Sequence, residues 1–277
     1  MHDIKSRIIK FIAEKNKLEK IKRKLKIVES FILANVKKEF YCPVCNKYIL
    51  DYLPIDNIFN ENLKKYGFKY SSDEFETFNP NKYTCPRCSS SDRDRLYALY
   101  IDKKIKELDQ TKKYNLIEFA PSLTKYLKSK NIFNYTSVDL YMESADIKAD
   151  IMDLKQIKDN SVDVFLCSHI LEHVKDDKKA LAELYRISKK DAWGIIMVPI
   201  PLPLEKTFED SSIIKEEDRW KYFGQNDHVR LYSKNDFMEK IINSGFSLEQ
   251  CGIDFFDKDN FKKMGINDKS ILYIVRK

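Results

Sequence analysis

Four cysteines form two pairs whose spacing suits a metal ion. Cys42 and Cys45 frame a Cys-Pro-Val-Cys segment, and Cys85 and Cys88 frame Cys-Pro-Arg-Cys. Each pair can present two thiolates to one ion, and two pairs complete a tetrahedral structural Zn²⁺ site. The 39 residues between the pairs exceed a simple ribbon spacing, so we expect an insertion there. The alternatives are a thiol-disulfide motif or unrelated buried cysteines.

Two aspartates follow apolar segments at positions suited to a nucleoside. Asp139 lies near the end of the segment 135–140, and an acidic group at the end of a second strand can accept hydrogen bonds from both ribose hydroxyls. Asp150 could face an adenine amino group, with Ile151 and Met152 packed on the ring. A loop with helix-capping aspartates is the alternative.

The elements that would position these residues follow from hydrophobic patterning. Apolar, β-branched segments alternate with amphipathic ones, which is typical of βαβ units in a parallel sheet. The carboxyl ends of such strands meet at one edge, where these folds bind ligands. The predicted strands are 116–120, 135–140, 162–167 and 192–200. The predicted helices are capped by Ser89-Ser90-Ser91-Asp92 and by Asp176-Asp177, and a third spans about Leu123 to Lys130.

The positive charge belongs to the N-terminal segment. Residues 1–40 hold 12 Lys/Arg and 5 Asp/Glu, whereas residues 41–277 hold 38 of each. A stripe of apolar residues between Leu18 and Ile32 predicts an amphipathic helix over residues 4–36. We expect it to dock on its own domain or on a second subunit, with an anionic membrane surface or RNA as alternatives. The balanced charge of the remainder disfavours a nucleic-acid binder.

No segment is suited to span a membrane. The longest mostly apolar run, 193–204, is short and contains Pro199, Pro201 and Pro203, which break a helix. The N-terminus is too charged for a secretion signal. We therefore expect a cytoplasmic protein, with peripheral association at the inner membrane face through residues 4–36 as an option.

The C-terminal two thirds of the chain resemble a known family. Residues 112–277 resemble class I S-adenosylmethionine-dependent methyltransferases. The resemblance rests on Asp159-Asn160-Ser161-Val162-Asp163-Val164, followed by His169-Ile170-Leu171-Glu172-His173-Val174 and Glu183-Leu184-Tyr185-Arg186. Two further stretches are similar to a bacterial subgroup of this family that has N-terminal Cys-Pro-x-Cys pairs. They are Phe223-Gly224-Gln225 with Asp227-His228-Val229-Arg230-Leu231-Tyr232, and Lys206-Thr207-Phe208-Glu209-Asp210. Many members of the subgroup belong to surface-polysaccharide pathways.

The resemblance implies a fold and three domains. The fold is α/β, a Rossmann-like seven-stranded sheet with helices on both faces, closed by strands from 246–253 and 270–276, one of them antiparallel. A zinc-ribbon-like lobe and the amphipathic helix precede it. The expected domains are a basic helix over 1–40, a zinc lobe with its insertion and connecting helix over 41–110, and the methyltransferase domain over 111–277.

The resemblance also implies a cofactor site for S-adenosylmethionine. Glu118 would orient the first loop or the cofactor's amino group, and Ser168 and His169 would line the methyl donor. The full set of expected cofactor contacts is Glu118, Phe119, Ala120, Pro121, Asp139, Leu140, Asp150, Ile151, Met152, Ser168 and His169. The family's first loop is normally glycine-rich, whereas here it is Glu118-Phe119-Ala120-Pro121-Ser122, with Ala120 small enough for close approach.

Methyl transfer to a hydroxyl also needs a base. Histidine is suited to this role, and the resemblance favours His228, with Asp227 orienting it, over His169. Three cations are candidates to bind an acidic group of the acceptor: Arg230, Lys206 and Arg95. Arg93 also lies just after the second cysteine pair and could reach the same group. We expect O-methylation of a sugar or nucleotide-linked glycan precursor. The alternatives are an RNA methyltransferase and a non-catalytic assembly module.

Overall fold

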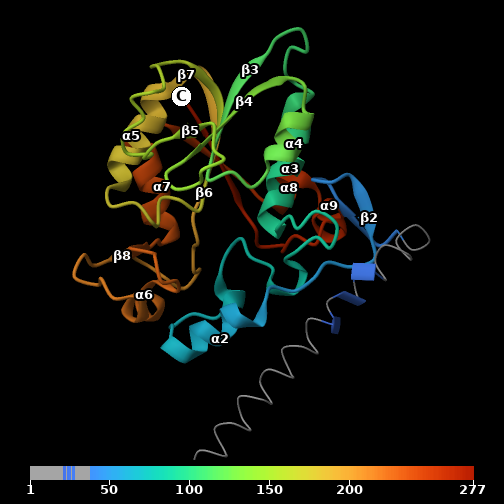
Figure 1. The fold of residues 1–277 in the computed structure, drawn as a ribbon, viewed down its shortest axis with the longest axis vertical. Helices are drawn as coiled ribbons and strands as arrows, with labels where there is room; N and C mark the ends of the chain where they lie inside the picture. Colours follow the sequence, from blue (N-terminus) through green and yellow to red (C-terminus); the bar gives the residue numbers. More distant parts are fainter. Residues whose placement is uncertain (1–20, 23, 26, 29–37) are drawn as a thin grey trace, which may run out of the picture.

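The computed structural model describes residues 21–22, 24–25, 27–28 and 38–277 (Figure 1). Most of the predicted helix over 4–36 therefore lies outside the described residues. Of its apolar stripe, Ile21, Leu25 and Val28 are described; they are helical and exposed. None of the described helices is long and apolar enough to cross a membrane.

A seven-stranded sheet forms the centre of the molecule, in the order β10-β11-β7-β6-β3-β4-β5. Strands β3 to β7 run parallel, and β11 runs antiparallel to β7 and to β10. The expected mixed seven-stranded sheet is confirmed, including the single antiparallel strand. The strands are β3 (Tyr114–Phe119), β4 (Phe133–Asp139), β5 (Ile147–Lys148), β6 (Val162–Ser168), β7 (Ser188–Met197), β10 (Ser247–Cys251) and β11 (Leu272–Arg276).

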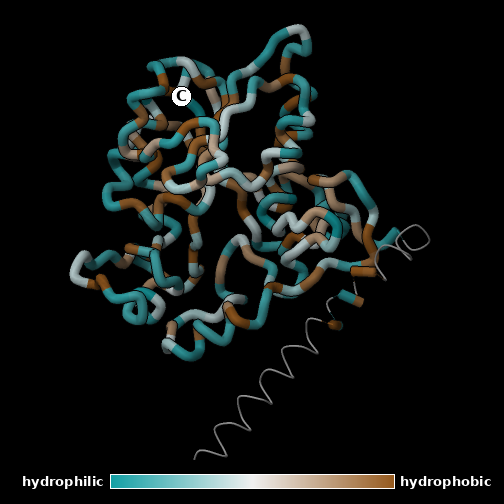
Figure 2. Tube along the Cα trace, in the orientation of Figure 1, coloured by the Kyte–Doolittle hydropathy of each residue, from teal (hydrophilic) through white to brown (hydrophobic). Residues whose placement is uncertain are grey.

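Helices cover both faces of this sheet. α3 (Asp92–Ile105) and α4 (Thr124–Ser129) lie on one side, and α5 (Asp177–Ile187) and α7 (Lys234–Asn243) lie on the other (Figure 1). The hydrophobic stretches run through the central strands, while peripheral loops are mostly hydrophilic (Figure 2). Within this core Gly194 of β7 lies beside Phe165 of β6, and a Cβ at Gly194 would lie 2.3 Å from the ring.

The segment before the sheet contains the two cysteine pairs. A short hairpin of β1 (Phe40–Cys42) and β2 (Lys47–Ile49) carries the first pair, and the second lies just before α3. Between them are α2 (Asn57–Tyr66) and two 3₁₀ turns, η1 (Ser72–Glu74) and η2 (Pro80–Lys82). Ser91 caps α3 by accepting a hydrogen bond from the Asp94 amide, as the predicted helix start requires.

The remaining elements follow β7 and β10. β8 (Phe208–Glu209) pairs with β9 (Arg230–Leu231), and α6 (Glu216–Phe223) lies between them in sequence. α8 (Ile253–Phe256) and α9 (Lys258–Lys263) connect β10 to β11. α6 packs against α2 through Trp220, whose ring stacks on that of Tyr66. The insertion between the cysteine pairs is thereby attached to the C-terminal half of the chain.

Candidate active site

Two cavities lie at the carboxyl ends of β3 and β6. The loop cavity, about 290 Å³, is lined by the first loop through Glu118, Ala120 and Ser122, and by Ser168. The aromatic cavity, about 380 Å³, is lined by five aromatic rings together with polar residues. Those rings are Phe59, Phe75, Phe78, Tyr83 and Phe223. Tyr83, Arg93 and His169 line both cavities and therefore stand between them.

The first loop is held by a buried carboxylate. Oε1 of Glu118 accepts hydrogen bonds from the amides of Ser122 (2.9 Å) and Leu123 (2.6 Å), and Oε2 accepts one from the Tyr135 hydroxyl (2.6 Å). Burial raises the pKa of Glu118, while these hydrogen bonds oppose that rise. Glu118 thus orients the loop, which is one of the two roles expected for it.

Ala120 explains how this loop turns without glycine. Its backbone is left-handed (φ 47°), and its amide donates to the Val138 carbonyl. A left-handed conformation costs an L-residue about 1–2 kcal/mol, which is why glycine is usual at such positions. The alanine keeps the turn at this cost, and its small side chain lines the loop cavity.

His169 directly follows β6 and adopts a second left-handed conformation in this site (φ 55°), with its amide donating to the Met197 carbonyl. Nη1 of Arg93 lies 2.7 Å from Nε2 of His169, and Nη2 of Arg93 donates to the Tyr83 hydroxyl (3.2 Å). Burial and the Arg93 charge lower the pKa of His169 well below its usual value. The imidazole is therefore neutral at pH 7.

The far wall of the aromatic cavity carries Glu172, His173 and His228. The two histidine rings meet edge-on, with centroids 4.6 Å apart. Nδ1 of His228 lies 3.3 Å from the Phe223 carbonyl oxygen, and burial followed by the neighbouring His173 lowers the pKa of His228 to about 3. Asp227, expected to orient His228, instead places Oδ2 3.3 Å from Nδ1 of His173.

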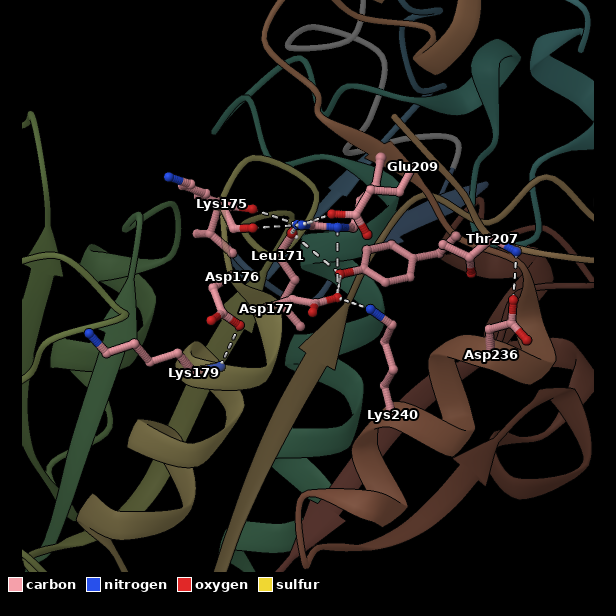
Figure 3. Close-up of polar contacts among 12 residues, drawn as sticks. Leu171, Lys175, Asp176, Asp177, Lys179, Thr207, Glu209, Asp236 and Lys240 are labelled. Atoms are coloured by element: carbon pink, nitrogen blue, oxygen red, sulfur yellow. Dashed lines mark hydrogen bonds and ion pairs between the residues drawn. The ribbon is translucent and has the colours of Figure 1, made fainter. Parts of the chain in front are cut away.

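Arg230 occupies a different position from the one expected of a substrate contact. Its guanidinium is 1% exposed and donates to the carbonyls of Leu171, Val174 and Lys175 and to the carboxylate of Glu209. Figure 3 shows these contacts beside Asp177, which accepts from Lys240 and Tyr232. Arg230 lines neither cavity; its many donors hold the loop that carries Glu172 and His173.

The other two predicted substrate cations also line neither cavity. Arg95 is 0% exposed, and it donates to the carbonyls of Met264, Tyr83, Ser90 and Lys82. It fastens the cysteine-containing segment to the chain near α9. Lys206 is exposed. The cation that does reach the cavities is Arg93.

The predicted nucleoside contacts lie along the same sheet edge, outside the two cavities. Phe119 of β3 pairs with Val138 of β4, which sets Asp139 next to the first loop. Oδ1 of Asp139 accepts from the amides of Tyr141 and Met142 (both 2.7 Å), and Oδ1 of Asp150 accepts from the Met152 amide. Leu140 is exposed, Ile151 is buried, and Pro121 and Met152 are half-buried.

The four paired cysteines come together as predicted. Their Sγ atoms all lie within 4.8 Å of one another, with Cys42 and Cys88 3.7 Å apart and Cys45 and Cys85 4.0 Å apart. Thiolates at about 2.3 Å from a tetrahedral Zn²⁺ stand about 3.8 Å apart. The donor set and its spacing fit a structural zinc ion, and the four cysteines are not in disulfides.

Sequence reasoning missed the role of the insertion. Residues between the cysteine pairs line part of the aromatic cavity, namely Ile55, Phe59, Phe75, Thr77 and Phe78. It also gave no functional role to Glu172 or His173. The one available signal was the Phe-rich composition of 59–78, which a single sequence cannot distinguish from an ordinary core.

Part of the chain matches a known protein family. Residues 105–196, from the end of α3 through most of β7, match a family described as a methyltransferase domain. No curated protein matches the chain. The chain is similar to the CurJ carbon methyltransferase, with 11% identity, coverage of 64% of this chain and 51% of that one, and a TM-score of 0.42. It is similar to the (4+2)-cyclase SpnF, with 11% identity, coverage of 66% and 81%, and a TM-score of 0.42. It is also similar to a SAM-dependent methyltransferase from Archaeoglobus fulgidus, with 14% identity, coverage of 68% and 95%, and a TM-score of 0.41. The chain spans about half the length of the first.

Proposed function

We propose that this protein is an S-adenosylmethionine-dependent methyltransferase that methylates a hydroxyl of a sugar or nucleotide-linked glycan precursor. The observation that carries the proposal is the junction of the two cavities at Tyr83, Arg93 and His169. A methyl donor in the loop cavity and an acceptor in the aromatic cavity would meet at this junction. The methyltransferase-domain match of residues 105–196 supports the same assignment.

The bound cofactor would supply an electrophilic methyl group on a sulfonium. Glu118 would hold the loop against its methionine end, and Asp139 and Asp150 would bind its ribose and adenine. The buried hydrogen bonds of Glu118 make this loop rigid before any ligand binds, which limits the entropy lost on binding.

The residues at the junction have separate tasks. His169, alone among the three described histidines in lining both cavities, would accept the proton as the acceptor's O–H bond breaks. The oxygen would form a bond to the methyl carbon with its freed electron pair, and the C–S pair would pass to sulfur. Arg93 would keep the imidazole neutral, and its N–H would have to leave Nε2 as the acceptor hydroxyl approaches that nitrogen. We therefore propose His169 as the base, although the family resemblance favours His228.

The aromatic cavity supports a sugar-like acceptor. Its rings offer apolar faces, on which the C–H face of a sugar can pack, beside the polar side chains of Thr77, Gln225 and Arg93. A nucleotide-linked sugar would bring phosphate oxygens that suit Arg93. Its place in surface-polysaccharide synthesis follows from the resemblance of 206–210 and 223–232.

The test is calorimetric titration of zinc-loaded protein with S-adenosylmethionine and then S-adenosylhomocysteine. We expect micromolar binding that Asp139→Ala abolishes and Lys206→Ala, on an exposed loop, leaves unchanged. Transfer of a labelled methyl group to a panel of nucleotide sugars then identifies the acceptor, with His169→Gln as the inactive control. Absence of cofactor binding by the folded protein would overturn the proposal.

A further inference from the structure

Glu172 has a buried carboxylate that no described residue satisfies. Its side chain is 1% exposed, and neither oxygen accepts a hydrogen bond among the described residues. Nδ1 of His169 approaches Oε1 to 3.1 Å, but outside hydrogen-bond geometry. A buried unsatisfied group costs roughly 1–3 kcal/mol, and more when it is charged. Such a group is expected where a ligand completes it.

The nearby arginines do not fill this role. Arg93 uses its guanidinium on His169 and Tyr83, and Arg230 uses its own on backbone carbonyls and Glu209. Burial raises the pKa of Glu172 to about 8, although the charges of Arg93 and Arg230 oppose that rise, and neither arginine donates a hydrogen bond to the carboxyl group. The carboxylate therefore faces the aromatic cavity with both oxygens available.

Two histidines stand beside it, each with an acceptor oxygen close to its Nδ1. Ligand atoms of Glu172, His173 and His228 all lie within 4.8 Å of one another. Nδ1 of His173 lies 3.3 Å from Oδ2 of Asp227, and Nδ1 of His228 lies 3.3 Å from the Phe223 carbonyl oxygen. A carboxylate or carbonyl on one ring nitrogen fixes the proton there and leaves the other nitrogen as a ligand. Both rings thus have Nε2 available.

We infer that Glu172, His173 and His228 form a second metal site, which binds one divalent transition-metal ion such as Zn²⁺, Fe²⁺ or Mn²⁺ in the aromatic cavity. Two imidazoles and one carboxylate suit these ions and leave coordination positions open. Ligand atoms at about 2.1 Å from a tetrahedral ion stand about 3.4 Å apart, so only a small movement of the three side chains is needed.

The fold already restrains the ligands. Arg230 holds the carbonyls on either side of Glu172 and His173, and the Val229 amide donates to the Glu172 carbonyl, which ties the His228 segment to the same loop. Restrained ligands lose little freedom on binding an ion, which favours a built site over a chance cluster.

The role of this ion in catalysis rests on the proposed function. A cation at this position would bind an acceptor hydroxyl at an open coordination position and lower the pKa of that hydroxyl. His169, beside Glu172, would then accept the proton from a more acidic group. His228 would act as a ligand through its neutral imidazole.

The experiment counts metal ions and does not require activity. Protein is equilibrated with micromolar free Zn²⁺, and zinc is measured per chain in the wild type and in Glu172→Gln and His228→Gln. We expect two ions per wild-type chain, one on the four cysteines and one here, and one ion in each variant. Asp227→Asn should weaken the second ion about 10–100-fold, because it removes the partner of a ligand.

Two controls keep the result interpretable. Replacement of zinc by Co²⁺ reports the cysteine site through its thiolate-to-metal absorption, which should persist in every variant and shows that each is folded. Glu118→Gln, which alters a buried carboxylate of the other cavity, should retain two ions. A single ion in the wild type, or two in Glu172→Gln, would overturn this inference. Either result leaves cofactor binding, measured separately, to decide the proposed function.

Discussion

Nη1 of Arg93 lies 2.7 Å from Nε2 of His169, so a residue of α3 contacts the residue that directly follows β6. This contact joins the segment containing the cysteines to the sheet edge at the point where the two cavities meet. Burial lowers the pKa of His169, and the permanent charge of Arg93 lowers it further. The pair therefore sets the protonation state at the proposed reaction centre.

Substitution Arg93→Gln should raise the pKa of His169, because it removes a positive charge beside the imidazole. The imidazole then becomes protonated at a higher pH than in the wild type, and it loses its ability to accept a proton over that added range. Titration of the protein by histidine NMR would show the shift directly. Lys104→Gln, on the same helix but outside both cavities, should leave the titration unchanged, and an unshifted His169 in Arg93→Gln would contradict the prediction.

Substitution Ala120→Gly should stabilise the protein by about 1 kcal/mol, because glycine adopts the left-handed backbone of this loop without steric cost. Urea unfolding would measure the change. Ala145, whose φ is not positive, serves as the control, and Ala145→Gly should be neutral or destabilising. A loss of stability in Ala120→Gly would show that the methyl group makes a contact worth more than the strain.

Asp177 should contribute to stability in a pH-dependent way. Burial acts to raise its pKa, but the hydrogen bonds from Lys240 and Tyr232 and the charge of Arg230 outweigh burial and lower the pKa. A lowered folded-state pKa means that the contribution is complete above the unfolded-state value of about 3.9 and is lost as pH falls through the folded-state value.

Substitution Asp177→Asn should therefore cost about 3 kcal/mol at neutral pH, because it leaves Lys240 and Arg230 without their shared partner. The difference from the wild type should shrink as the pH falls below the unfolded-state pKa of about 3.9, and it should vanish below the lower folded-state pKa, where the wild-type carboxylate is also neutral. Urea unfolding at several pH values would test this. Asp176→Asn, which keeps a side chain able to cap α5, is the adjacent control; a pH-independent cost for Asp177→Asn would count against the ionised carboxylate.

Substitution Cys85→Ser should release the ion from the cysteine site and loosen the segment 46–84 while the sheet persists. The core beside the cysteine cluster is small, made of Cys42, Ile49, Tyr52 and Cys85, so we expect a bound ion to stabilise this part of the chain. Amide hydrogen exchange should increase there and remain slow in β3, β6 and β7. Cys251→Ser, in β10 and outside the cluster, is the control, and equal exchange in both variants would argue against a structural ion.

Much of the sheet was predictable from sequence because its signals are local. The runs around Leu116, Val138 and Val164 each carry a strand's hydrophobic pattern, and the intervening polar segments carry helix caps such as Asp176. The loops that follow parallel strands all lie at one edge of the sheet. The location of the site at that edge could therefore be predicted from the strands alone. The meeting of the four cysteines follows likewise from ligand chemistry and spacing.

Tertiary structure decided which side chains reach the cavities. Arg93 and Arg95 are two residues apart on α3 and so point about 200° apart around the helix; one faces the cavities and the other is buried against carbonyls. Asp227 is adjacent to His228 in sequence but pairs with His173 from another loop. In the sequence, Glu172 is one residue of a run that resembles a known family. Only the tertiary structure shows that its carboxylate is buried and accepts no hydrogen bond from the described residues. Sequence determined the scaffold because hydrophobic periodicity acts locally, whereas side-chain partners are set by contacts between distant segments, which no local pattern records.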